Sequence, residues 1–179
     1  VIDATLGGGG HTEEILKRVL LKGKVIALDA DADAIKKFEV CAASDIAIKQ
    51  ALTDKSLILA HSNYSSLEEM LKQRGIALCD AIIADLGFSS DQIEEGERGF
   101  SFLRAGPLDM RFDRTTELTA EKIVNTFSAP ELSKIFREYG DENESWRIAL
   151  AIEDFRQIHP IKTTVELSAI IERAYPKSR

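Results

Sequence analysis

The sequence predicts an α/β fold, with a doubly wound parallel sheet in the first half of the chain and helices alone in the second half. Three observations support this prediction. Short apolar runs alternate with helix-like stretches through the first half. Four consecutive glycines, Gly7 to Gly10, join the first apolar run to the first helical stretch. Later apolar runs are nearly continuous, as expected for strands of a parallel sheet with both faces buried.

The first half contains four apolar runs of strand length. We expect strands at residues 1–5, 24–28, 57–60 and 79–86, the last with an apolar centre at 81–84. Helices are expected between them at residues 12–21, from 31 to about 52, and from 65 to 72. Ser65 and Glu68 have the spacing of a capping box for the last of these helices, and Gly75 ends it.

The second half changes in character. Residues 87–113 contain glycines and charges with little periodicity, which indicates a long ordered loop. Helices are then expected at residues 119–127, 130–140, 142–157 and 164–174, with a capping box of Thr163 and Glu166 before the last. The chain therefore divides into residues 1–92, the first part of a ligand-binding α/β domain, and residues 93–179, the loop and an inserted helical domain. Because the chain opens on a strand and only helices follow the fourth strand, we expect a fragment whose sheet is incomplete at its C-terminal strands.

Composition narrows the class of protein. The 179 residues carry a net charge of −7, which argues against a strongly basic nucleic-acid-binding surface over the whole chain. No window approaches the roughly 18 apolar residues of a membrane helix. Two isolated cysteines make neither a disulfide framework nor a zinc site. Cys79 lies in an apolar run and is predicted to be buried, which fits a reducing compartment.

The glycine run at residues 7–10, followed by His11, has the features of a ligand loop. Glycines permit positive φ and let a ligand approach the backbone closely. The helix that follows offers unpaired N–H groups to an anion. A flexible turn is the alternative, but four glycines at a strand-to-helix junction disfavour it. No Gly-Lys-Ser/Thr follows, which excludes a P-loop, whereas a dinucleotide loop stays open.

The charges around this loop favour one ligand. Glu13 and Glu14 suit the positive end of the helix dipole but would repel a pyrophosphate placed there. Asp3, Asp29 and Asp85 lie within strands or at their ends. An edge lined with acids suits a ligand that carries a sulfonium, an ammonium and a single carboxylate, which describes S-adenosylmethionine.

Asp29 follows the second strand, 19 residues after Gly10. An acid at this place binds ribose hydroxyls in nucleoside-binding α/β folds. Helix capping is the alternative role, and Asp31 and Asp33 are nearby candidates for the ribose.

The run from Asp85 to Gln92 lies at the carboxyl end of the fourth strand, the edge where open α/β sheets bind ligands. Its carboxylate, hydroxyls and aromatic ring suit a flat base that carries an amine. Such an amine is a poor nucleophile, so acceptors for its N–H groups assist attack on a methyl group. Asp85 and Ser89 are therefore the candidate catalytic residues, and Phe88 is a candidate to stack on the base. The alternative is a turn in which Asp85 caps locally.

Two further segments, residues 98–102 and 107–113, interleave arginines with aromatic residues. Arg98, Phe100 and Arg111 are candidate RNA contacts, through phosphates and stacking. Loop packing, with an ion pair from Arg111 to Asp109 or Asp113, is an equally supported alternative. We expect no metal site here, because no histidine or further acid lies at ligand spacing.

These motifs together resemble one family, the RsmH (MraW) small-subunit rRNA cytidine N4-methyltransferases. The resemblance covers nearly the whole chain, and its most specific parts are the Arg-Gly-Phe-Ser-Phe run at 98–102 and the Pro-Leu-Asp-Met-Arg run at 107–111. The other matching segments lie at residues 3–12, 27–31, 63–65, 85–92, 137–140 and 161–167. The resemblance implies a class I (Rossmann-like) methyltransferase fold with an inserted helical domain. It also implies an enzyme that methylates cytidine in the decoding region of small-subunit rRNA.

The resemblance also assigns roles to single positions. Tyr64 stands where the family usually has phenylalanine. Asp85, already a candidate catalytic residue, is also implied to contact the cofactor. The implied contacts of S-adenosylmethionine are Gly9, Gly10, His11, Asp29, Tyr64, Asp85 and Gln92. The small ribosomal subunit is the implied partner. We expect no membrane association, and a homodimer is compatible with the sequence. The implied compartment is the cytoplasm, or an organellar matrix in a eukaryote.

Two departures and three alternatives accompany this interpretation. The family's residues before the first strand are missing, and so is a downstream motif resembling histidine-proline-alanine-threonine. The missing part is a candidate for the basic RNA-binding surface that a charge of −7 does not provide. The alternatives are a methyltransferase for a protein or small molecule, a non-catalytic cofactor-binding scaffold on the ribosome, and a nicotinamide-dependent dehydrogenase.

Overall fold

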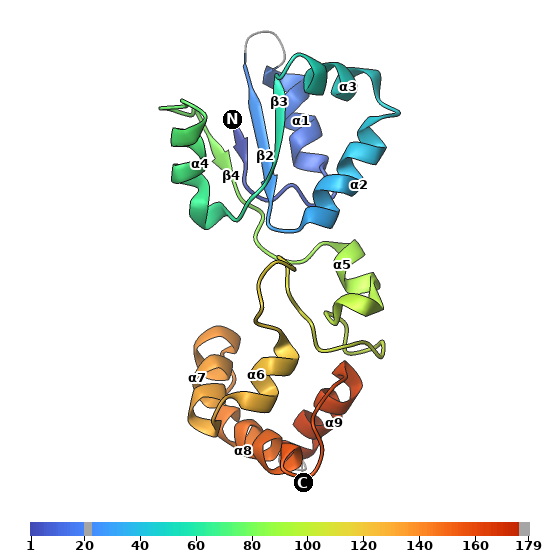
Figure 1. The fold of residues 1–179 in the computed structure, drawn as a ribbon, viewed down its shortest axis with the longest axis vertical. Helices are drawn as coiled ribbons and strands as arrows, with labels where there is room; N and C mark the ends of the chain where they lie inside the picture. The colour runs from blue at the N-terminus through green and yellow to red at the C-terminus, as the bar shows by residue number, and fades with distance from the viewer. Residues whose placement is uncertain (20–22, 176–179) are drawn as a thin grey trace. The chain divides into compact units, whose positions relative to one another are not determined.

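The computed structural model describes residues 1–19 and 23–175. The chain separates into two compact units, Val1–Ser89 and Ser90–Arg179 (Figure 1). The first unit contains the sheet and the second is helical, so the α/β class is confirmed.

The sheet of the first unit is parallel throughout. Its strands are β1 (Ile2–Asp3), β2 (Val25–Asp29), β3 (Leu57–His61) and β4 (Ile82–Ile83), in the order β3-β2-β1-β4. Ile26 of β2 is in register with Ile2 on one side and Ile58 on the other. The carboxyl ends of all four strands therefore meet at one edge of the sheet.

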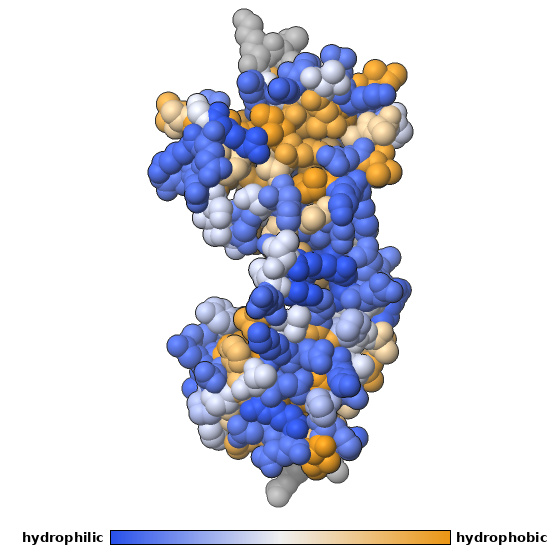
Figure 2. All heavy atoms as spheres, viewed as in Figure 1, coloured by the Kyte–Doolittle hydropathy of each residue, from blue (hydrophilic) through white to orange (hydrophobic). Residues whose placement is uncertain are grey.

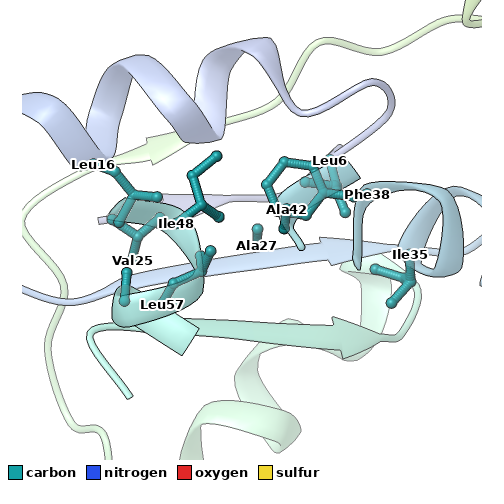
Figure 3. Close-up of a cluster of buried hydrophobic side chains, with 10 residues drawn as sticks. Leu6, Leu16, Val25, Ala27, Ile35, Phe38, Ala42, Ile48 and Leu57 are labelled. Carbon is teal, nitrogen blue, oxygen red and sulfur yellow. The ribbon is translucent and has the colours of Figure 1, made fainter. Parts of the chain in front are cut away.

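Helices cover both faces of this sheet (Figure 1). Side chains of β2 alternate between the two apolar clusters: Val25 and Ala27 belong to one, and Ile26 and Leu28 to the other. The first cluster includes side chains of α1 (Gly10–Val19), α2 (Ala32–Ala42) and α3 (Ile46–Thr53) (Figure 3). The second is covered by α4 (Leu67–Gln73), which follows the short helix η1 (Tyr64–Ser66). Burial on both faces explains why β2 is apolar from Val25 to Leu28.

Two helical details of the first unit differ from the sequence prediction. The helix expected from residue 31 to 52 is two helices, because the Asp45 carboxylate accepts the N–H groups of Ala47 and Ile48 and begins α3 anew. The capping box of Ser65 and Glu68 is wrong. Ser66 begins α4 without a side-chain hydrogen bond, and Asn63 accepts the Ser65 N–H instead.

The fourth strand differs most. It has two residues, where eight were expected, and Cys79 is exposed, where burial was expected. Among the described residues β4 pairs only with β1, so its outer edge has no neighbouring strand. Ile82 of β4 is half-exposed, and Leu78, which precedes the strand, is almost fully exposed.

The second unit begins with α5 (Ser90–Glu94) and η2 (Gly96–Arg98), inside the segment expected to be a loop without helices. The later helices are confirmed as α6 (Ala120–Thr126), α7 (Ala129–Gly140), α8 (Ser145–Arg156) and α9 (Thr164–Ala174). The capping box of Thr163 and Glu166 is also confirmed. Leu132, Ile152 and Ile161 are fully buried at the centre of this unit. No helix in the described part of either unit has the length and apolar character to cross a membrane.

Candidate functional site

Three candidate elements meet at the carboxyl edge of the sheet. The glycine loop follows β1, and β1 lies between β2, which ends at Asp29, and β4, which is followed by Asp85. The Leu6 N–H donates to the Leu28 carbonyl at 2.9 Å, and the Asp85 N–H donates to Thr5 Oγ1 at 2.7 Å. The strand order reverses beside β1, and ligands of open α/β sheets bind at such a reversal.

The glycine loop has a fixed conformation. Gly9 has a φ of +86°, and a Cβ added there would lie 2.2 Å from two ring atoms of Phe38. Phe38 is buried in the core, so its ring has no room to move away. The Gly9 N–H donates to the Leu6 carbonyl at 2.7 Å. The alternative of a flexible turn is therefore not supported.

Helix α1 begins directly after this loop. Its first intrahelical bond joins the Glu13 N–H to the Gly9 carbonyl at 2.9 Å. Helix geometry leaves the N–H groups of Gly10, His11 and Thr12 without intrahelical acceptors. Glu14 forms an ion pair with Lys17, with a nitrogen–oxygen distance of 2.7 Å. Glu13 is therefore the one acid of the first turn that is placed to interact with the helix dipole. Gly10 and His11 are exposed and their N–H groups could hold an anion such as a carboxylate, whereas Thr12 is fully buried.

Asp29 fastens the glycine loop to β2. Its Oδ2 accepts the Gly7 N–H at 2.8 Å, and its Oδ1 accepts the Asp31 N–H at 2.8 Å. A carboxylate offers about four acceptor positions, so about two remain for hydroxyl groups. Asp31 is itself the residue that caps α2, since it accepts the Asp33 N–H at 3.0 Å. The capping role considered for Asp29 thus belongs to Asp31.

The structure adds Asp3, which the sequence placed in the acidic edge but not among the site residues. Asp3 is fully buried, and its carboxylate accepts the Thr12 hydroxyl at 2.7 Å and the Thr5 N–H at 3.2 Å. Burial raises the pKa of Asp3, and the hydrogen bond from Thr12 opposes that rise. Asp3 joins β1 to the first turn of α1 and so positions the glycine loop. An acid inside an apolar strand was the signal that could have identified it.

Tyr64 and His11 lie on the same edge. The Ser62 N–H donates to the Asp29 carbonyl at 2.9 Å, which holds the chain after β3 beside the end of β2. Tyr64 begins η1 two residues later with its side chain half-exposed. His11 is exposed in the first turn of α1. The first unit therefore brings Gly9, Gly10, His11, Asp29, Tyr64 and Asp85 to one edge.

The segment after β4 is exposed. Asp85 is fixed through its backbone, and its carboxylate faces solvent. Phe88 presents an exposed ring, and Ser89 is the last residue of the first unit. Gln92 belongs to the second unit, where it lies in α5 with its side chain buried. Its contact with a cofactor stays a prediction.

Arg98 and Phe100 are engaged inside the loop of the second unit. The guanidinium of Arg98 is buried, donates to the Arg111 carbonyl at 3.0 Å and lies 5.8 Å from the centre of the Phe100 ring. Gly99 has a φ of +73°, and a Cβ there would lie 2.1 Å from the Pro107 carbonyl oxygen. These contacts support the loop-packing interpretation of the motif. Contact of Arg98 or Phe100 with RNA stays a prediction.

Arg111 forms a two-point ion pair with Asp109. The Arg111 Nε and Nη2 donate to the two Asp109 oxygens at 2.7 and 2.8 Å. Arg111 Nη1 also donates to the Thr116 carbonyl at 2.7 Å. The hydrogen bonds from Arg111 lower the pKa of Asp109 below its usual range. Of the two acids considered as its partner, Asp109 is the one joined by these bonds.

Asp109→Asn is expected to reduce the change in the free energy of unfolding between neutral and acidic pH. The pKa of Asp109 is lower in the folded state than in the unfolded state. The ionised carboxylate therefore stabilises the fold at pH values above the unfolded pKa of about 4. This stabilisation is lost as the pH falls through the folded pKa, which is lower still. Urea unfolding midpoints measured against pH test this. The variant should be less stable than the parent at neutral pH and should converge with it in acid. Asp154→Asn, which alters an exposed acid of α8, is the control, and a pH-independent difference would contradict the ion-pair account.

Comparison with known proteins settles the family. The model of the MraW methylase family matches residues 1–179. The chain belongs to the MraW methylase family. The family resemblance inferred from the motifs is therefore confirmed. The four-stranded parallel sheet is consistent with a Rossmann-like methylase.

Members of this family with curated names are similar along the chain. The protein named ribosomal RNA small subunit methyltransferase H of Halothermothrix orenii is 47% identical over 177 residues, covering 99% of this chain and 54% of its own length. Proteins of the same name from Clostridium botulinum strain Kyoto and Clostridioides difficile are 43% and 39% identical, and each match covers 98% of this chain and 54% of the relative. The chain thus spans about half the length of these relatives.

Proposed function

We propose that this MraW family chain is the S-adenosylmethionine-binding part of an enzyme that methylates the N4 amine of cytidine in small-subunit rRNA. The observation that carries the proposal is the glycine loop, held in one conformation between Asp29 and Asp85 at the carboxyl edge of a parallel sheet. The names of the relatives favour rRNA over a protein or small molecule as substrate.

The residues at this edge fit the proposed cofactor. When bound, S-adenosylmethionine supplies a methyl group activated by its positive sulfonium. The remaining acceptor positions of Asp29 suit ribose hydroxyls, and the N–H groups at the start of α1 suit the carboxylate. Gly10 is exposed and lets a ligand lie against the backbone, whereas the missing Cβ of Gly9 makes room for the Phe38 ring. The half-exposed ring of Tyr64 is available to stack on the adenine.

The proposed chemistry needs alignment more than activation. With the cofactor bound, transfer would form a nitrogen–carbon bond to the cytidine amine as the carbon–sulfur bond breaks, leaving S-adenosylhomocysteine and releasing one amine proton to solvent. Asp85 accepts a hydrogen bond from this amine, Ser89 assists it, and Phe88 stacks on the base. Holding the reactants in line supplies most of the rate increase.

The finer architecture is also part of the proposal. We infer that the helical unit is an insertion that recognises the substrate, and that further strands complete the sheet along the open edge of β4. Two observations support this. Leu78, Ile82 and Leu86 are exposed beside that edge, and the relatives are nearly twice as long as this chain. The small ribosomal subunit is the proposed partner.

Asp85→Ala in the full-length protein is expected to reduce cytidine methylation by about a hundredfold or more, because the amine loses its acceptor. The measurement is mass spectrometry of rRNA nucleosides from a strain that lacks the native gene and carries the variant. Asp80→Ala is the matched control, since it removes an exposed carboxylate before β4 rather than after it. Unchanged N4-methylcytidine with Asp85→Ala would rule out the catalytic role. If N4-methylcytidine persisted in a strain that carries neither the native gene nor a variant, the proposed function would be refuted.

A further inference from the structure

A groove lies between α7 and α8 of the helical unit, and none of its lining residues belongs to the candidate cofactor site. It has a volume of about 420 Å³ and is lined by Pro130, Ser133, Lys134, Arg137, Glu138 and Trp146. The five residues from α7 have the spacing of one helix face. The buried hydroxyls of Ser133 and Ser145 are hydrogen-bonded at 3.2 Å, which fixes the two helices against each other at the groove.

The chemistry of this α7–α8 groove contrasts with the rest of the chain. Trp146 is 50% exposed, although tryptophan is the largest apolar surface that a side chain can bury. Lys134 and Arg137 are both exposed, and among the described residues neither forms an ion pair. Glu138 is the one acid in the lining. The lining thus carries two cations and one acid, a positive balance in a chain whose net charge is −7.

We propose that the α7–α8 groove binds a single-stranded segment of the substrate RNA. One base stacks on Trp146, and the adjoining phosphates lie at Lys134 and Arg137. Single strands are held in this way by cations that follow the backbone and aromatic rings that stack on the bases. This inference rests on the proposed function, because it assumes that the substrate is RNA.

Glu138 adds a preference among bases. A carboxylate repels phosphate but accepts hydrogen bonds from an exocyclic amine, as acids do with the N4 group of cytosine. A base with such an amine is therefore expected beside Trp146. Oligocytidine should bind more tightly than oligouridine, and Glu138→Gln should weaken that preference.

Trp146 is the only tryptophan in the chain, so its fluorescence reports directly on the groove. Oligocytidine is expected to quench this fluorescence, and heparin, a polyanion without bases, is not. Trp146→Ala should reduce the affinity for a labelled oligocytidine by about tenfold or more. The double variant Lys134→Gln, Arg137→Gln should weaken binding. It should also reduce the slope of log affinity against log salt concentration by about 1.4, because each lost phosphate contact contributes about 0.7.

Two matched controls keep this test specific. Tyr139→Ala removes an aromatic ring that is 84% exposed on the same helix but does not line the groove, and Lys122→Gln removes an exposed cation of α6. Both should bind oligocytidine as the parent does. Absence of quenching, equal quenching by heparin, or an equal loss in Tyr139→Ala would overturn the inference. If only the groove inference is wrong, the chain still binds S-adenosylmethionine at Asp29. If the parent chain binds no S-adenosylmethionine, the proposed function itself is refuted.

Discussion

Gly9→Ala is expected to destabilise the first unit by about 2–5 kcal/mol, the sum of a left-handed backbone at a residue with a Cβ and an overpacked core. The φ of +86° contributes the first effect, and the 2.2 Å approach to the Phe38 ring contributes the second. Domains of this size are stable by about 5–15 kcal/mol, so the loss is a large fraction of the total. Urea unfolding followed by circular dichroism measures it.

Gly8→Ala is the matched control for this prediction. A Cβ at Gly8 meets no atom within 4 Å, and its φ lies outside the left-handed region. The control should therefore unfold at nearly the urea concentration of the parent. If the two variants were equally stable, the Gly9 loop would be the flexible turn that the structure argues against.

Asp29→Ala is expected to lower the affinity for S-adenosylmethionine by at least about a hundredfold, which corresponds to about 2.7 kcal/mol. The variant loses the acceptors proposed for the ribose. It also releases the N–H of Gly7, so the glycine loop loses its tie to β2. Titration calorimetry on the chain measures the affinity.

Asp45→Ala separates this effect from general destabilisation. Asp45 also accepts two backbone N–H groups, but at the start of α3 and not at the carboxyl edge. Loss of this cap should reduce stability by about 1 kcal/mol and leave cofactor affinity unchanged. Parent-like affinity in Asp29→Ala would remove the ribose assignment.

Much of the fold follows from local sequence rules. The alternation of β2 between two apolar clusters produces the continuous apolar run that predicted a buried parallel strand. The capping box of Thr163 and Glu166 is likewise determined by neighbouring residues. Asp45 could also have been identified locally, because a capping residue inside a helical pattern marks a new helix as well as an interruption.

Other features depend on contacts between distant residues. The apolar run at 79–86 forms a two-residue strand, because the extent of pairing depends on a neighbour and not on the run itself. The close approach that leaves no room for a Cβ at Gly9 is made by Phe38, which is remote in sequence. Arg98 contacts carbonyl groups 13 and 14 residues away, so no local pattern distinguished a buried arginine from an RNA-binding one.

The candidate site shows the same division. Strand ends and glycines predicted that Gly9, Gly10 and Asp29 would meet, and the hydrogen bond from Gly7 to Asp29 joins the two elements. Asp3 was not assigned a role, because its partner Thr12 lies on a different element and the contact appears only when β1 and α1 pack together.

The most direct test of the proposed site is a crystal structure of this chain with S-adenosylhomocysteine, the product form of the cofactor. We expect the ribose hydroxyls at the Asp29 carboxylate, the amino-acid end at the start of α1 and the adenine beside Tyr64. A nucleoside bound elsewhere on the chain, or a ribose turned away from Asp29, would contradict the account.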